Sequence, residues 1–314
     1  MTGSALRSSP TRRRRSSGGN GGSRSIAALG RRGTRVIYML AFAVFFAVPL
    51  IWLVLAPTKT NEEIASTSPF AFGSFANVAV AWENLMSFNS GVLLQWLVNS
   101  VDYAVWTTAL AVITAIPAGY GLAKFEFIGR KPLLWCTLIA MIIPEIALVL
   151  PLFLEMNALN LIGSKWAVIL PLSLFPFGVY LSYLHFTSNF PTTLMEAARI
   201  DGASEARIFT SLALPLARSL IGLVGFFAFV RSWSAFFLPF VMLADDRSFT
   251  LQIGLKNLLE STGAINPSLG QSTLPVHAPE AALAGLITVG PILLVFLFAQ
   301  RFLTAGQLAG AEKG

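Results

Sequence analysis

The stretch Glu196-Ala197-Ala198-Arg199-Ile200-Asp201-Gly202-Ala203-Ser204 is a short polar island between two hydrophobic segments. Its pattern predicts a short helix, a glycine turn and the start of a second helix, in a loop outside the membrane. A chain composed mostly of lipid-compatible residues has little use for such a loop unless the loop contacts something soluble. We therefore expect a transport subunit that is driven by a separate protein.

The composition of the whole chain is that of a membrane protein. Hydrophobic residues make up 55% of the 314 residues and charged residues only 12%, whereas a soluble domain carries about a quarter charged residues. Six stretches approach the roughly 20 apolar residues that a membrane-crossing helix needs. They are residues 36–55, 97–123, 132–154, 166–185, 219–243 and 281–303. We predict an all-α, polytopic membrane protein with six transmembrane helices.

Lysine and arginine residues indicate the orientation, because they are enriched in cytoplasmic loops. The inner loops would hold Lys124, Arg130, Lys131, Arg199, Arg207, Arg218, Arg301 and Lys313, and the outer loops Lys59, Lys165, Arg247 and Lys256. Both termini are therefore expected in the cytoplasm. The outer segments 56–96 and 244–279 are long, with short helices expected near 80–86 and 251–259. They either meet an extracytoplasmic partner or merely cover the membrane domain.

Residues 1–34 form a tail rich in Gly, Ser and Arg, and no acidic residue occurs before Glu62. Such a tail cannot bury a core, so we expect a disordered cytoplasmic segment that touches anionic lipid. A nucleic-acid-binding arm is the weaker interpretation, and we expect no nucleic-acid partner. Residues 35–314 would form the permease domain, with a cytoplasmic loop at 191–214. The run 36–57 is too long for a signal peptide, and we interpret it as a retained first span.

Within the cytoplasmic loop, Thr193 and Glu196 have the spacing of a capping box. The first helix would run over residues 194–200, and Gly202 would end it in the left-handed conformation. Ser204 would cap the next helix, which Pro215 would kink. A helix resting on lipid is the alternative, but such helices favour basic residues and bulky apolar anchors.

The same loop carries a family resemblance. Glu196-Ala-Ala, followed by Asp201-Gly202 and by Pro215 thirteen residues beyond the glycine, resembles the coupling-loop motif of permease subunits of bacterial ABC importers. Other stretches resemble the carbohydrate subgroup, which includes permeases similar to the maltose-system G subunit: Asn99-Ser100, 118–123, Ile143-Pro144, Trp233 and 310–314. The resemblance covers residues 36–314. Ser234 departs from it, because the family usually has Asn there, and so does the arginine-rich tail.

The resemblance implies a type I importer permease (MetI-like) fold in the bacterial cytoplasmic (inner) membrane, which forms half of a translocation pathway. The implied partners are a second permease subunit, a dimer of ATPase subunits and an extracytoplasmic solute-binding protein, with a sugar or oligosaccharide as substrate. The residues implied to couple to the ATPase are Glu196, Ala197, Ala198, Arg199, Asp201 and Gly202. ATP and Mg would bind to the ATPase subunits.

No chemistry of its own is expected of this chain. It lacks the Walker A pattern, so ATP hydrolysis is expected elsewhere. Cys136 is the only cysteine, and neither His185 nor His277 has companions at a metal-ligand or triad spacing. We therefore expect no cofactor, no metal and no enzymatic activity.

Ionisable residues inside a membrane usually face a cavity or a partner. Glu145 and Arg231 are expected at comparable depth in the third and fifth spans. They either pair across the bundle or line a polar pocket, where Trp233 would stack on a sugar ring. Ser234 and Asn99 complete the candidate pathway residues, although Asn99 fits a hydrogen bond to a neighbouring helix better.

Three alternatives remain open. Arg231 would also suit a glycerol-phosphate or another small polar solute in the same type of importer. A stand-alone secondary transporter would need more than one buried acid and would leave the loop without a role. A membrane scaffold without transport would not need Glu145 and Arg231 inside the bilayer.

Overall fold

The computed structural model describes the backbone of residues 21–261 and 276–311, in two units that comprise residues 1–52 and 53–314. The described part of the first unit belongs to the helix α1 (Gly21–Leu55). Residues 21–34 are therefore helical, which corrects the expected extent of the disordered tail. Extending an existing helix costs far less than starting one, so the first span can continue toward the N-terminus. Residues 1–20 of the expected tail lie outside the described residues.

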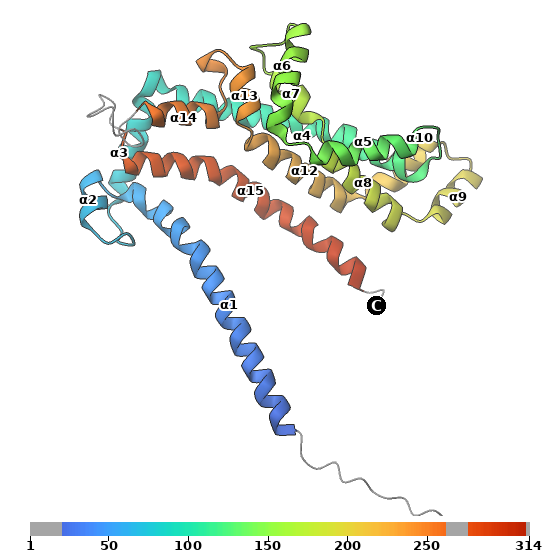
Figure 1. The fold of residues 1–314 in the computed structure, drawn as a ribbon, viewed down its shortest axis with the longest axis horizontal. Helices are drawn as coiled ribbons and strands as arrows, with labels where there is room; N and C mark the ends of the chain where they lie inside the picture. Colours follow the sequence, from blue (N-terminus) through green and yellow to red (C-terminus); the bar gives the residue numbers. More distant parts are fainter. Residues whose placement is uncertain (1–20, 262–275, 312–314) are drawn as a thin grey trace, which may run out of the picture. The chain divides into compact units, whose positions relative to one another are not determined.

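The described part of the second unit is built from helices (Figure 1). They are, in chain order, η1 (Ala56–Thr58), α2 (Asn61–Ser66), α3 (Phe75–Ser87), η2 (Phe88–Gly91), α4 (Val92–Lys124), α5 (Arg130–Ile142), η3 (Glu145–Leu148), α6 (Val149–Ala158), α7 (Trp166–Ser173), α8 (Pro176–Asn189), α9 (Thr192–Ile200), α10 (Glu205–Ile208), η4 (Phe209–Ala213), α11 (Leu214–Leu216), α12 (Arg218–Trp233), α13 (Phe237–Met242), η5 (Asp246–Ser248), α14 (Leu251–Glu260) and α15 (Ala278–Ala311). Helices α3 and α14 confirm the two short outer helices.

The described residues contain four candidate membrane spans, or up to six if each bent pair of helices is one span, and these overlap the six expected stretches. Four are helices long and apolar enough to cross a membrane, at Thr34–Thr58, Phe75–Lys124, Trp166–Asn189 and Ala278–Phe302. The other two result when each bent pair of helices counts as one span: Arg130–Ile142 with Glu145–Ala158, bent by 108°, and Glu205–Leu216 with Arg218–Trp233, bent by 78°. The all-α class of the prediction is confirmed.

Three of these spans are interrupted, where the sequence suggested continuous helices. The third breaks after α5, because Pro144 has no N–H and its ring forces Ile143 into an extended conformation (φ −66°, ψ 124°). The fourth breaks between α7 and α8, immediately before Pro176. The predicted helix over 219–243 ends already at Trp233, and α13 restarts with Pro239 in its first turn, where a missing N–H costs nothing.

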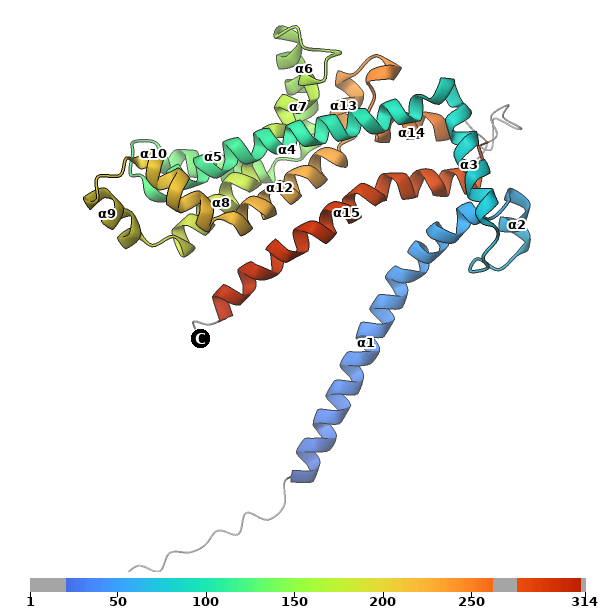
Figure 2. The same ribbon diagram turned by 180° about the vertical axis from the view of Figure 1, so that it is seen from behind.

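The core around the cytoplasmic half of the second unit is formed by α4, α8 and α12, which lie side by side in both views (Figure 2). Its members include Ile116, Tyr120, Phe186 and Val224, all buried. Gly119 allows α4 and α8 to touch, because a Cβ at this position would overlap the side chain of Ser182. Lys124 at the end of α4 donates to the carbonyl of Phe190 at 2.5 Å, so the loops after α4 and α8 lie at the same end of the bundle.

Candidate coupling loop and membrane cavity

The cytoplasmic loop begins with α9, and its start differs from the prediction. Pro191 is the N-cap, with φ −64° and ψ 135°, and no side chain caps the helix. Thr193 therefore lies inside the first turn and does not form the expected capping box with Glu196. The reason is that an N-cap residue must be extended, and Pro191 already takes that conformation two residues earlier.

The end of α9 confirms the predicted glycine turn. Gly202 has a positive φ of +78°. The N–H of Gly202 donates to the carbonyl of Arg199 at 3.0 Å, and the N–H of Ala203 donates to that of Ala198 at 2.9 Å. These two hydrogen bonds form a Schellman motif, which satisfies the last carbonyls of the helix. Ser204 then accepts from the N–H of Arg207 at 3.4 Å, which confirms it as the cap of α10.

Two charged side chains of the loop pair with each other. Nε of Arg199 donates to Oε1 of Glu205 at 2.6 Å, and this hydrogen bond raises the pKa of the guanidinium above its ordinary value. Arg199 therefore braces the turn as well as facing solvent. Glu205 is not among the predicted coupling residues, although a carboxylate six residues away across a glycine turn is a usable signal for a partner of Arg199.

The solvent-exposed surface of α9 and of the turn after it carries both charged and apolar residues. Glu196, Ala197, Asp201 and Gly202 are exposed and Ala198 is half-buried, while Met195 points into the core. Ile200 is 86% exposed, which is unusual for a large apolar side chain beside a cluster of charges. The structure thus brings the six predicted coupling residues onto one compact loop and adds Ile200 to its surface.

Consecutive helical segments connect this loop to α12. After α10 the chain forms the π-helical turn η4 and the short α11, with Pro215 in its first turn, and then bends by 78° into α12. The expected kink near Pro215 is confirmed. Ile208 and Ala213 are buried in the same core as Tyr120 of α4. The loop is therefore joined to α12 through helical segments that pack against the core.

The far end of α12 borders a cavity of about 470 Å³. Its polar lining consists of Glu145, Arg231 and Ser234. The remaining lining residues are apolar and come from three broken spans: Ile146, Leu148, Val149, Leu152, Pro171, Leu172, Val230, Ala235, Phe236, Phe237 and Leu238. The structure therefore unites three of the five candidate pathway residues at one site.

Arg231 forms hydrogen bonds to the third and fourth spans where these two spans are interrupted, beside the cavity. Its Nε donates to Oε1 of Glu145 at 2.6 Å, just after the break in the third span. Its Nη1 donates to the carbonyls of Leu172 and Leu174, at 2.8 and 3.1 Å, at the break in the fourth span. The predicted pairing of Glu145 with Arg231 is therefore present, and the pair also lines the cavity. Pairing across the bundle and lining a pocket, the two alternatives for these residues, therefore occur together.

Trp233 lies elsewhere, which corrects the idea that it stacks on a sugar ring. Its side chain is 1% exposed, its indole N–H donates to the carbonyl of Thr288 at 2.9 Å, and its ring stacks on Phe229. A ring held this way offers no free face to a solute. The helical period places Trp233 on the opposite side of α12 from Arg231, where α15 covers it.

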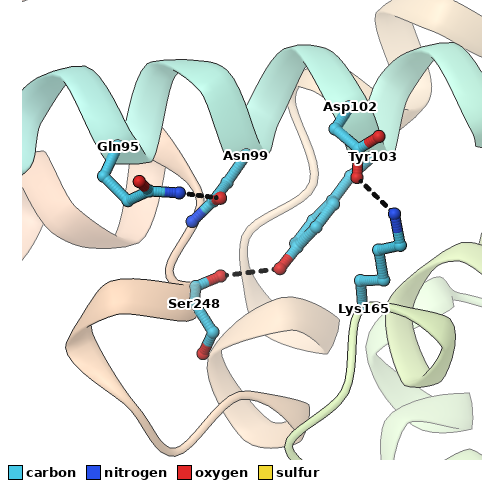
Figure 3. Close-up of polar contacts among 6 residues, drawn as sticks. All are labelled: Gln95, Asn99, Asp102, Tyr103, Lys165 and Ser248. Carbon is cyan, nitrogen blue, oxygen red and sulfur yellow. Dashed lines mark hydrogen bonds and ion pairs between the residues drawn. The ribbon is translucent and has the colours of Figure 1, made fainter.

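Asn99 also lies away from the cavity, as part of a polar row on α4 (Figure 3). Its Nδ2 donates to the carbonyls of Arg247 and Phe249, and its Oδ1 accepts from Gln95 at 2.8 Å. The hydroxyl of Tyr103 donates to the carbonyl of Ser248 at 2.9 Å. Asn99 thus binds a neighbouring segment, as the sequence analysis favoured.

The same row contains an ion pair that the sequence did not reveal. Asp102 accepts from Nζ of Lys165 at 2.9 Å, which ties α4 to the start of α7 (Figure 3). The indole N–H of Trp96 donates to the carbonyl of Asp246 at 2.8 Å. The outer half of α4 is therefore the scaffold on which the described part of the second outer segment is held. Residues 262–275 of that segment lie outside the described residues.

Comparison with known proteins gives consistent matches over nearly the whole chain. Residues 115–307 match the family described as binding-protein-dependent transport system inner membrane component. The arabinooligosaccharides transport system permease protein AraQ of Halalkalibacterium halodurans is 32% identical over 278 residues, which cover 87% of this chain and 94% of that protein. The galactooligosaccharides transport system permease protein GanQ of Bacillus subtilis is 31% identical, over 90% of this chain and 98% of that protein.

A solved structure supports the fold independently. It is the crystal structure of a bacterial ABC transporter involved in the import of the acidic polysaccharide alginate, with a TM-score of 0.73 and 20% sequence identity. The match covers 88% of this chain and 97% of the matched chain. At this identity the likeness bears on the fold alone.

Proposed function

Because this chain belongs to the family of binding-protein-dependent transport system inner membrane components, we propose that it is a permease subunit of an ATP-driven importer for an oligosaccharide. It is a multi-pass protein of the bacterial inner membrane. The proposal of an oligosaccharide is supported by relatives named for arabinooligosaccharide and galactooligosaccharide transport. The observation that carries the proposal is the braced, exposed loop from α9 to α10.

In this proposal a separate ATPase subunit, which binds ATP and Mg, receives the exposed face of α9. Glu196 and Ala197 are exposed on α9, Gly202 is exposed in the turn that follows it, and Ile200 supplies an apolar contact at the end of the helix. Closure of an ATPase dimer would displace the loop, and α12 would carry the displacement to Arg231 at the cavity. A ligand can shift such an equilibrium only by binding the two states unequally, so the loop must contact the ATPase differently in each.

The cavity would belong to the translocation pathway, which a second permease subunit would complete. A solute-binding protein would deliver the sugar to the outer side, on which α2, α3 and α14 would lie in the predicted topology. Lipid would cover the remaining apolar surface. We assign no catalytic residue to this chain, because hydrolysis would take place on the ATPase subunit.

The decisive experiment is purification of the tagged chain in mild detergent from a strain that expresses its neighbouring transport genes. We expect an ATPase and a second permease to copurify, with ATP hydrolysis that neutral oligosaccharides and the solute-binding protein stimulate. A chain that purifies alone, and catalyses sugar uptake driven by a proton gradient, would contradict the proposal and favour a secondary transporter.

The coupling role is tested by Glu196→Lys, with Glu126→Lys as the matched control. Both glutamates are exposed, but Glu126 lies in the loop after α4 and outside the proposed contact. We expect Glu196→Lys to insert normally and to lose ATP-dependent uptake at least about tenfold, because a reversed charge in an interface costs a kilocalorie per mole or more. Equal uptake by both variants would remove the loop from the coupling interface.

A further inference from the structure

The positive charge of Arg231 is already balanced inside the cavity. Its Nε is 2.6 Å from Oε1 of Glu145, and its Nη1 donates to two backbone carbonyls. The arginine side chain is 25% exposed, so much of the guanidinium is covered. A solute that enters the cavity therefore meets a cation that is already paired with a carboxylate and whose Nε and Nη1 already donate within the protein.

Glu145 is the more accessible member of the pair. Its side chain is 68% exposed, and within the described residues its hydrogen bond to Arg231 uses only Oε1. Among the residues that line the cavity, Glu145 and Arg231 are the charged ones, so the lining has no net charge. The more exposed charge of the lining is consequently the negative one.

This arrangement distinguishes solutes by charge. A carboxylate or phosphate group would lose its hydration on entry and would meet the like charge of Glu145, next to a guanidinium whose charge that carboxylate already balances. A sugar hydroxyl, in contrast, can donate to the carboxylate in a charge-assisted hydrogen bond, and it can also exchange a hydrogen bond with Ser234. The apolar remainder of the lining suits the C–H faces of a sugar ring.

We propose that this cavity selects neutral, polyhydroxylated solutes over anionic ones, and that Glu145 is the specificity-determining residue. The inference rests on the proposed function and narrows its substrate class. It also weighs against a phosphorylated solute, because the guanidinium that would receive a phosphate is held by Glu145 and the carbonyls of the fourth span.

The test uses the assembled complex of both permeases and the ATPase in lipid nanodiscs, without the solute-binding protein, so that its selectivity cannot contribute. The probes are radiolabelled galactotriose and maltotriose, and the same two trisaccharides oxidised at C6 to uronates. Equilibrium dialysis gives the dissociation constant for each. We expect at least one neutral trisaccharide to bind about tenfold more tightly than its uronate, a difference of about 1.4 kcal/mol.

Glu145→Gln is the informative variant, because its amide oxygen can still accept from Arg231 while the negative charge is gone. We expect the preference for the neutral sugar to disappear or reverse in Glu145→Gln and to persist in Glu145→Asp. Glu155→Gln is the matched control: Glu155 is exposed on α6, close in the sequence, and does not line the cavity. It should retain the wild-type preference.

Two results would overturn the inference: a wild-type complex that binds the uronates as tightly as the neutral sugars, or an unchanged preference in Glu145→Gln. A complex that hydrolyses ATP but binds none of the four trisaccharides would instead contradict the oligosaccharide proposal itself. Thermal unfolding of each variant complex verifies that the subunits stay folded and assembled.

Discussion

At the residue scale, the coupling loop depends on one backbone conformation. Gly202 has a φ of +78°, which costs a residue with a side chain roughly 1–2 kcal/mol. No atom lies within 4 Å of the position that a Cβ would take, so the cost of a substitution would be conformational rather than steric. The Schellman hydrogen bonds at this glycine set the angle between α9 and α10.

We predict that Gly202→Ala weakens coupling without preventing assembly. The strain, about 1 kcal/mol, should loosen the turn and lower sugar-stimulated ATP hydrolysis severalfold. Gly163→Ala is the matched control, because Gly163 also has a positive φ, of +83°, with open space around it, but belongs to a loop that is predicted on the opposite side of the membrane. The ratio of sugar uptake to ATP hydrolysed should fall only in the Gly202 variant.

Arg231 shows why a single residue can have two roles. Its guanidinium presents several donors in a rigid plane, so it can pair with Glu145 and cap the fourth span at the same time. A lysine could not form this set of bonds from one nitrogen on a flexible chain. The residue thus shapes the cavity and influences what the cavity accepts.

At the element scale, proline positions decide where the spans are interrupted. Pro144 and Pro176 each follow a residue outside the helical region, and the freed backbone groups lie beside Arg231. A proline also decides where α9 begins, as a comparison of two Thr-x-x-Glu sequences shows. Thr60 and Glu63 form a capping box at α2, whereas Thr193 and Glu196 do not, because Pro191 starts α9 earlier.

The contact between α4 and α8 yields a prediction. Gly119→Ala should place a Cβ against Ser182 and the backbone of Tyr183, forcing the helices apart at a cost of about 1–3 kcal/mol. Gly121→Ala, two residues along the same helix, has no atom within 4 Å of its new Cβ and should be neutral or slightly stabilising. Thermal unfolding of the purified complex distinguishes them. Equal stabilities would contradict the close packing of these helices.

At the scale of the whole molecule, the six spans and the loop charges require a particular topology. The basic residues near the ends of α4, α9 and α10 would lie in the cytoplasm, and α2, α3 and α14 outside. The chain contains a single cysteine, Cys136, so accessibility can be measured at chosen sites once it is replaced.

We predict that, in a Cys136→Ser background, Thr67→Cys reacts with a membrane-impermeant maleimide added to intact spheroplasts. Thr193→Cys should react only after the membrane is opened. Both threonines are exposed in the structure, so a difference in labelling reports the side of the membrane rather than burial. Labelling of Thr193→Cys in intact cells would reverse the proposed orientation and remove the loop from an ATPase.

The sequence alone determined the class of the protein, the six spans and the position of the loop, because hydropathy, basic residues and turn-forming glycine act locally along the chain. It also indicated that Glu145 and Arg231 could meet, since both are costly to bury unpaired. Tertiary structure decided the rest. Trp233 is buried against α15, Asn99 holds an outer segment, and Arg199 pairs with Glu205, because the neighbour of each side chain is set by how the helices pack. The charge that the cavity presents depends on the same packing, which engages Nε and Nη1 of Arg231 within the protein and leaves Glu145 the more exposed of the two.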